Sequence, residues 1–85
     1  MDAFSLTVHA AQMAKERGIK EEWISFVLRD PGVTKPDERD GNLTCVFRRI
    51  PEAGNRMLRL VIDSAQNPPR VITLFFDRKA SREMP

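Results

Sequence analysis

Two stretches in the first third of the chain carry apolar residues at helical spacing. The first predicts a helix over residues 8–17, with Thr7 as its N-cap and Gly18 as the residue that ends it. The second predicts a helix over residues 20–29, which ends because Pro31 disfavours a helical conformation in the residue before it. The short connection between the two stretches indicates a helical hairpin.

The rest of the chain alternates apolar and polar residues as strands do. Strands are predicted over residues 43–50, 56–63 and 70–77, separated by turns rich in Gly, Pro and Asn. A short edge strand is expected within residues 4–8, and residues 33–35 could start another. Helices followed by strands predict an α+β fold in the order (β)-α-α-β-β-β. In it, a helical hairpin packs on one face of a three- to four-stranded antiparallel sheet.

The strand pattern also predicts two apolar sheet faces. The face expected to meet the helices carries Leu58, Leu60, Ile62, Ile72, Leu74 and Phe76. The opposite face carries Met57, Arg59, Val61, Val71, Thr73 and Phe75. An apolar face without a helical cover indicates a partner protein, self-association, or the C-terminal tail lying over it.

Composition and length narrow the class of protein. The chain has 85 residues, and we expect one domain over residues 1–78 followed by a flexible basic tail over 79–85. No apolar run approaches the ~20 residues of a membrane helix, and residues 1–4 lack the pattern of a signal peptide. The single cysteine, Cys45, has no partner for an internal disulfide. We therefore expect a cytoplasmic protein that makes no membrane contact.

The net charge of +2 is unevenly distributed along the chain. Residues 1–47 carry 6 basic and 8 acidic side chains, whereas residues 48–85 carry 8 and 4. Arginine outnumbers lysine, and its planar guanidinium suits phosphate groups. Either a basic functional face or a genomic bias in composition explains this pattern.

Candidates for chemistry are few. His9, the only histidine, falls in the first turn of the first predicted helix, where the dipole favours a neutral imidazole that could act as a base. It could equally hydrogen-bond to a neighbouring strand and hold the helix in place. Arg17 at the other end of that helix could simply cap it. Cys45 is expected to fill the core. The sequence has none of the usual zinc patterns and no phosphate loop, so we expect no metal or cofactor.

Three further arginines are candidates to bind phosphate. Arg48 and Arg49 are adjacent in a predicted strand, so only one of them can share a face with Arg59. Arg59 interrupts an apolar strand, and its charge there needs a carboxylate, a phosphate or open solvent. The internal alternatives are salt bridges to Asp63, Asp77 or Glu16.

Four strings carry a resemblance to a known family: His9-Ala10, Glu-Arg-Gly-Ile at residues 16–19, Leu-Arg-Leu-Val-Ile at 58–62 and Val-Ile-Thr-Leu-Phe at 71–75. In this order they resemble a small bacterial family of domains of unknown function. That family is similar in architecture to the RelE-like and BrnT-like toxins of toxin–antitoxin pairs, several of which cut messenger RNA. The chain departs from the pattern of these families in two ways: it has no tyrosine, and Met13 stands at a position where the family often has arginine.

The resemblance implies a domain that contacts RNA, either as a metal-independent endoribonuclease or as an inactive relative. His9 and Arg59 would be the catalytic residues, and Arg17, Arg48, Arg49 and Arg59 would bind phosphate. A small acidic antitoxin-like protein would be its partner. The alternative function is a non-catalytic module that binds a protein, or a second copy of itself, through the uncovered sheet face.

Overall fold

The protein is described by a computed structural model that covers residues 4–84. In chain order the elements are β1 (Ser5–Leu6), α1 (Val8–Arg17), α2 (Glu21–Arg29), β2 (Val33–Pro36), β3 (Thr44–Ile50), a 3₁₀ turn η1 (Pro51–Ala53), β4 (Arg56–Asp63), β5 (Arg70–Phe76) and α3 (Arg78–Glu83). The predicted α+β class is confirmed. Within residues 4–84, no helix is both long enough and apolar enough to cross a membrane.

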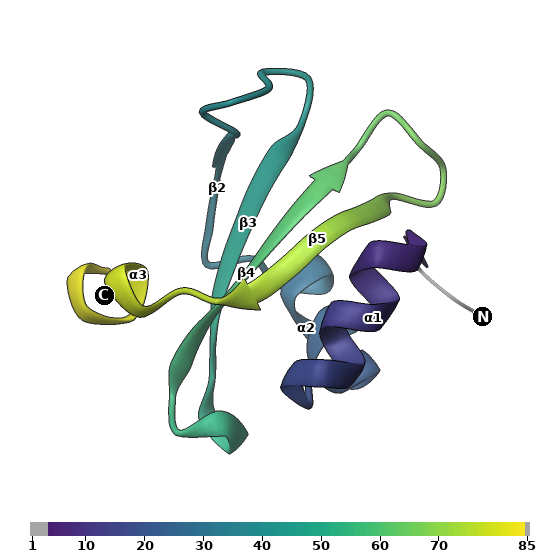
Figure 1. Cartoon of the computed structure of the whole chain (residues 1–85). Helices are drawn as coiled ribbons and strands as arrows, with labels where there is room; N and C mark the ends of the chain where they lie inside the picture. The colour runs from purple at the N-terminus through teal and green to yellow at the C-terminus, as the bar shows by residue number, and fades with distance from the viewer. Residues whose placement is uncertain (1–3, 85) are drawn as a thin grey trace.

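The strands form one mixed sheet in the order β1-β5-β4-β3-β2 (Figure 1). Strands β2 to β5 form an antiparallel meander, as predicted from their short connections. Strand β1 instead pairs in parallel with β5, through Ser5 opposite Arg70 and Leu6 opposite Val71. The sheet is therefore larger than predicted and not purely antiparallel, because no hairpin turn dictates the direction of a strand so distant in sequence from its partner.

The predicted N-cap and C-cap residues of the first helix, Thr7 and Gly18, begin and end α1 in the structure. The Thr7 hydroxyl accepts a hydrogen bond from the backbone N–H of Ala10 and donates one to the carbonyl of Ile72, so the cap also ties α1 to β5. Gly18 ends the helix in the left-handed conformation, with φ of 65°. These contacts position the first turn of α1, including His9, beside β5.

Both helices bury their apolar sides in the larger of two cores, on one side of the sheet. Leu58, Leu60 and Leu74 lie in this core as predicted. The assignment of Val71 and Ile72 to faces was wrong. Val61 pairs with Thr73 and Ile62 with Val71, so Ile72 is an extra, bulged residue and Val71 takes the fully buried core position.

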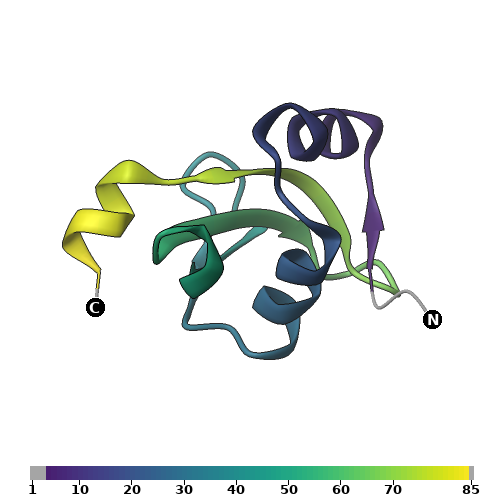
Figure 2. The same cartoon turned by 90° about the horizontal axis from the view of Figure 1, so that it is seen from below.

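A smaller core lies on the other side of the sheet, where α3 packs away from α1 and α2 (Figures 1 and 2). Residues expected to form part of a loose tail form this helix, which begins because the Asp77 carboxylate accepts a hydrogen bond from Ala80 N–H. Ala80 is buried against the sheet beside Phe47 and Met57. The sheet face expected to be uncovered is therefore covered at one end and open at the other.

Candidate functional site

His9 lies on the exposed surface of α1 and reaches across to β5. Its Nε2 is 3.2 Å from the Thr73 hydroxyl, a contact between residues 64 positions apart. This is the contact to a neighbouring strand that the sequence offered as the structural role of His9. Thr73 pairs with Val61, so Arg59 is its diagonal neighbour on the same face, an arrangement in which the two residues lie about 7–8 Å apart and a long side chain can span the gap. The sheet therefore brings His9 and Arg59 to one region.

Arg59 is held between two carboxylates on the face of the sheet that carries α3. Its Nη1 donates to Asp77 Oδ2 at 3.2 Å, and its Nη2 lies 3.7 Å from Asp37 Oδ1. Nη2 also contacts the sulfur of Cys45 at 3.3 Å. Of the three internal partners considered for Arg59, the structure selects Asp77, the residue that caps α3. Asp37 escaped prediction because it follows β2 in a charged turn whose path over the sheet has no local signal.

Two aromatic rings flank the same guanidinium. Its carbon lies 5.2 Å from the ring centroid of Phe47 and 5.5 Å from that of Phe75. Cation–π attraction therefore adds to the ion pairs. Within residues 4–84, the Nε atom of Arg59 is buried without a hydrogen-bond partner, and the contacts described there hold the side chain through its two terminal nitrogens and the rings.

The cluster favours ionised carboxylates and a neutral thiol. The thiol of Cys45 donates to Asp37 at 3.3 Å, and this hydrogen bond is the largest cause that lowers the pKa of Asp37. Burial alone would raise that pKa, but two backbone N–H groups and Arg59 also lower it. Burial would raise the pKa of Asp77, but the Ala80 N–H and Arg59 outweigh it and the pKa is lowered. Burial raises the pKa of the Cys45 thiol, which fits the predicted core role and not that of a nucleophile.

Two hollows on this face share Arg59 and Glu38 in their linings. The larger, with a volume of about 530 Å³, extends towards β5 and the turn after β2. Its lining combines two arginines with three carboxylates and with Thr73 and Phe75; the charged residues are Arg39, Arg59, Asp37, Glu38 and Asp40. The smaller, of about 280 Å³, extends towards α3, and both lysines and carboxylates contribute to its lining: Lys35, Lys79, Glu38, Asp77 and Glu83. His9 stands at the edge of the larger hollow through its contact with Thr73.

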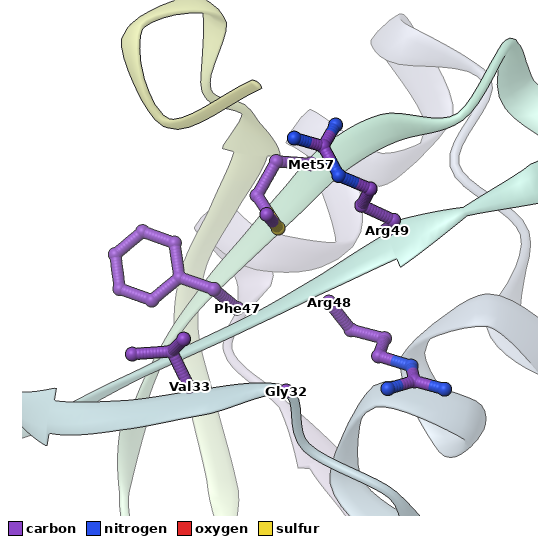
Figure 3. Close-up of a pocket in the computed structure, with 6 residues that line it drawn as sticks. All are labelled: Gly32, Val33, Phe47, Arg48, Arg49 and Met57. Atoms are coloured by element: carbon purple, nitrogen blue, oxygen red, sulfur yellow. The ribbon is translucent and has the colours of Figure 1, made fainter. Parts of the chain in front are cut away.

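Arg48 and Arg49 leave β3 in different directions around a separate hollow of about 280 Å³ (Figure 3). Arg48 forms an ion pair with Asp30 at 3.3 Å and stacks on Phe26, near α2. Arg49 lies on the face of Arg59, as its pairing with Met57 requires. The prediction that only one of the two shares that face is confirmed.

The two remaining phosphate candidates have other surroundings. The Arg49 guanidinium donates to the backbone carbonyls of Ser81 and Met84, so it stabilises the C-terminal end of α3. Arg17 is exposed in the last turn of α1, whose C-cap is Gly18, and does not line the larger hollow. The structure thus gathers His9, Thr73 and Arg59, and leaves Arg17 and Arg48 elsewhere.

Comparison with known proteins adds one finding. The family model of a domain of unknown function, DUF4258, matches residues 6–76, which include both N-terminal helices and strands β2 to β5. No curated protein and no solved structure matches the chain. The likeness to RelE-like and BrnT-like toxins stays a prediction.

Proposed function

The chain belongs to the DUF4258 family, a domain of unknown function, and we propose from the geometry of its own residues that it contacts RNA. The larger hollow beside Arg59 would hold a phosphodiester group, and His9 would promote its cleavage without a metal ion. The observation that carries this proposal is the His9–Thr73 contact, because it brings the only histidine to the strand beside Arg59.

The chemistry needs only the RNA and these side chains. A neutral His9 imidazole takes the proton of a 2′-hydroxyl, and that oxygen attacks the adjacent phosphorus. The bond from phosphorus to the 5′-oxygen breaks, the leaving oxygen takes a proton from water, and the His9 imidazolium returns its proton to the hydroxide that remains. The products are a 2′,3′-cyclic phosphate and a 5′-hydroxyl. Arg59 would stabilise the negative charge that builds on the phosphate oxygens, and Thr73 would orient the imidazole.

A phosphate at Arg59 has to replace one of its carboxylate partners. Asp77 is fixed by its hydrogen bonds to both Arg59 and the first turn of α3. Asp37 lies farther from the guanidinium, at 3.7 Å, so its contact with Arg59 is the weaker of the two, although the Cys45 thiol and two backbone N–H groups also donate to its carboxylate. The incoming phosphate would therefore displace Asp37 and leave Asp77 in place.

The test is a cleavage and binding assay with a single-stranded RNA oligonucleotide in the presence of EDTA. We expect cleavage to products ending in cyclic phosphate, and His9→Gln should abolish cleavage while binding persists. Thr73→Val should slow cleavage, whereas the matched control Thr34→Val on the exposed strand β2 should not. An oligonucleotide with 2′-deoxy sugars should bind and remain intact. Failure of the wild-type protein to bind RNA would refute the proposal.

One observation favours a second candidate, a protein-interaction module. Strand β2 is an edge strand whose four residues are all exposed, and Val33 at its start lines the hollow of Figure 3 together with Phe47 and Met57. An open edge can accept a strand from a partner or from a second copy. Sedimentation equilibrium tests self-association, which should disappear when a charge replaces the apolar side chain in Val33→Glu.

A further inference from the structure

We infer that the RNA bound beside Arg59 is single-stranded, with one unpaired base stacked on Phe75 and the backbone continuing past Lys79. This inference rests on the proposed function and specifies its substrate. It follows from the combination of an accessible ring, two lysines that stand outside the ion pairs of the described residues, and the size of the larger hollow.

Phe75 is the phenylalanine placed to receive a base. It is partly exposed, lines the larger hollow and keeps its ring 5.5 Å from the Arg59 guanidinium. Phe47, on the other side of that guanidinium, is only 1% exposed. The neighbouring Phe76 points into the larger core, where its ring meets Trp23 edge to face at 6.2 Å. A base entering the hollow would therefore meet Phe75.

The two hollows meet at Arg59 and give the strand a direction. From the base site beside Phe75, the path crosses Arg59 and enters the smaller hollow, where Lys35 and Lys79 lie among the carboxylates of Glu38, Asp77 and Glu83. Among the described residues neither lysine forms an ion pair with a carboxylate. Aromatic rings that stack bases beside cations that follow the backbone are the common arrangement of single-strand binding surfaces.

A duplex fits this arrangement poorly. In a double helix the bases are stacked on each other, so no base face is free to lie on Phe75, and A-form RNA is recognised mainly from its shallow minor groove. A hollow of about 530 Å³ is in the range that holds one small molecule, which suits one unstacked nucleotide and not a helix about 20 Å across.

The experiment measures fluorescence anisotropy with an eight-nucleotide RNA and with its blunt duplex, using full-length protein that carries His9→Gln so that the RNA stays intact. We expect the single strand to bind at least tenfold more tightly than the duplex. Phe75→Leu should weaken single-strand binding by about 5- to 150-fold, the range for loss of one stacked base. Phe75→Trp should retain it. The matched control is Phe26→Leu, which removes the ring stacked on Arg48 near α2 and should change affinity less than twofold.

Equal affinity for both RNA forms, or an unchanged affinity in Phe75→Leu, would overturn the inference and leave the proposed function standing. Absence of binding to either form would overturn both. If Phe75→Leu does not fold, as judged by Trp23 fluorescence, an RNA that contains 2-aminopurine tests the wild-type ring directly. Stacking should quench its fluorescence upon binding, and unchanged fluorescence would refute the stacked base.

Discussion

Asp77 connects the ion pair of Arg59 to the start of α3, so its replacement gives a stability change with two separable parts. One carboxylate oxygen accepts the Ala80 N–H as the helix cap, and the other accepts the Arg59 guanidinium. Asp77→Ala removes both contacts. Asp77→Asn keeps an oxygen for the cap and removes the charge that faces Arg59.

The magnitudes follow from the environment of each contact. Loss of a helix cap costs ~1 kcal/mol. A hydrogen bond to a charged group contributes ~1.5–3 kcal/mol, and the larger range for this pair applies because the side chains of Arg59 and Asp77 are only 24% and 14% exposed. We expect Asp77→Ala to lower the free energy of unfolding by ~2–4 kcal/mol. Asp77→Asn should lower it by ~1 kcal/mol less, because the cap remains. A domain of this length has a total of ~4–13 kcal/mol, so either loss is measurable.

Urea unfolding followed by the fluorescence of Trp23, the only tryptophan, measures both changes. The control is Asp30→Ala, which breaks the more exposed ion pair with Arg48 and should cost less than ~1 kcal/mol. Equal destabilisation by Asp77→Ala and Asp77→Asn would show that the cap contributes nothing. A cost below ~0.5 kcal/mol for Asp77→Ala would refute the shielded ion pair.

Three other outcomes are expected. The pKa values of Asp37 and Asp77 are lowered in the folded protein, so their stabilisation is complete above pH ~4 and is lost as the pH falls through the folded values. Urea midpoints should therefore drop below that pH, less steeply in Asp77→Asn; parallel profiles would contradict this. Gly18→Ala should cost ~1 kcal/mol in a thermal melt because Gly18 has φ of 65°, whereas Gly41→Ala, in open space, should be nearly neutral. Asp37→Asn should raise the affinity for single-stranded RNA severalfold in an anisotropy titration because it removes the carboxylate that competes with phosphate, and weaker binding would argue against that competition.

Local sequence signals predicted the elements but not every side-chain direction. The Thr7 cap, the stop at Gly18 and the bounds of β4 depend on neighbouring residues and could be predicted. The exchange of Val71 and Ile72 between faces could not, because the bulge arises from how β5 pairs with β4. The parallel pairing of β1 likewise depends on contacts across most of the chain.

The candidate site shows the same division. Strand alternation predicted that Arg59 and Thr73 share a face, and the cost of burying a charge predicted an acidic partner such as Asp77. Asp37 reaches Arg59 only because the turn after β2 folds over the sheet, which no sequence spacing indicates. The sequence predicted that His9 could hydrogen-bond to a neighbouring strand. It did not indicate that the partner would be Thr73, a residue on the strand beside Arg59.

The most direct test of RNA contact at this site is a titration of ¹⁵N-labelled protein carrying His9→Gln with the eight-nucleotide RNA, followed by NMR. We predict that the largest amide shifts fall on Arg59, Thr73 and Phe75, around the larger hollow. Shifts confined to α2 and β2, or no shifts at saturating RNA, would contradict it.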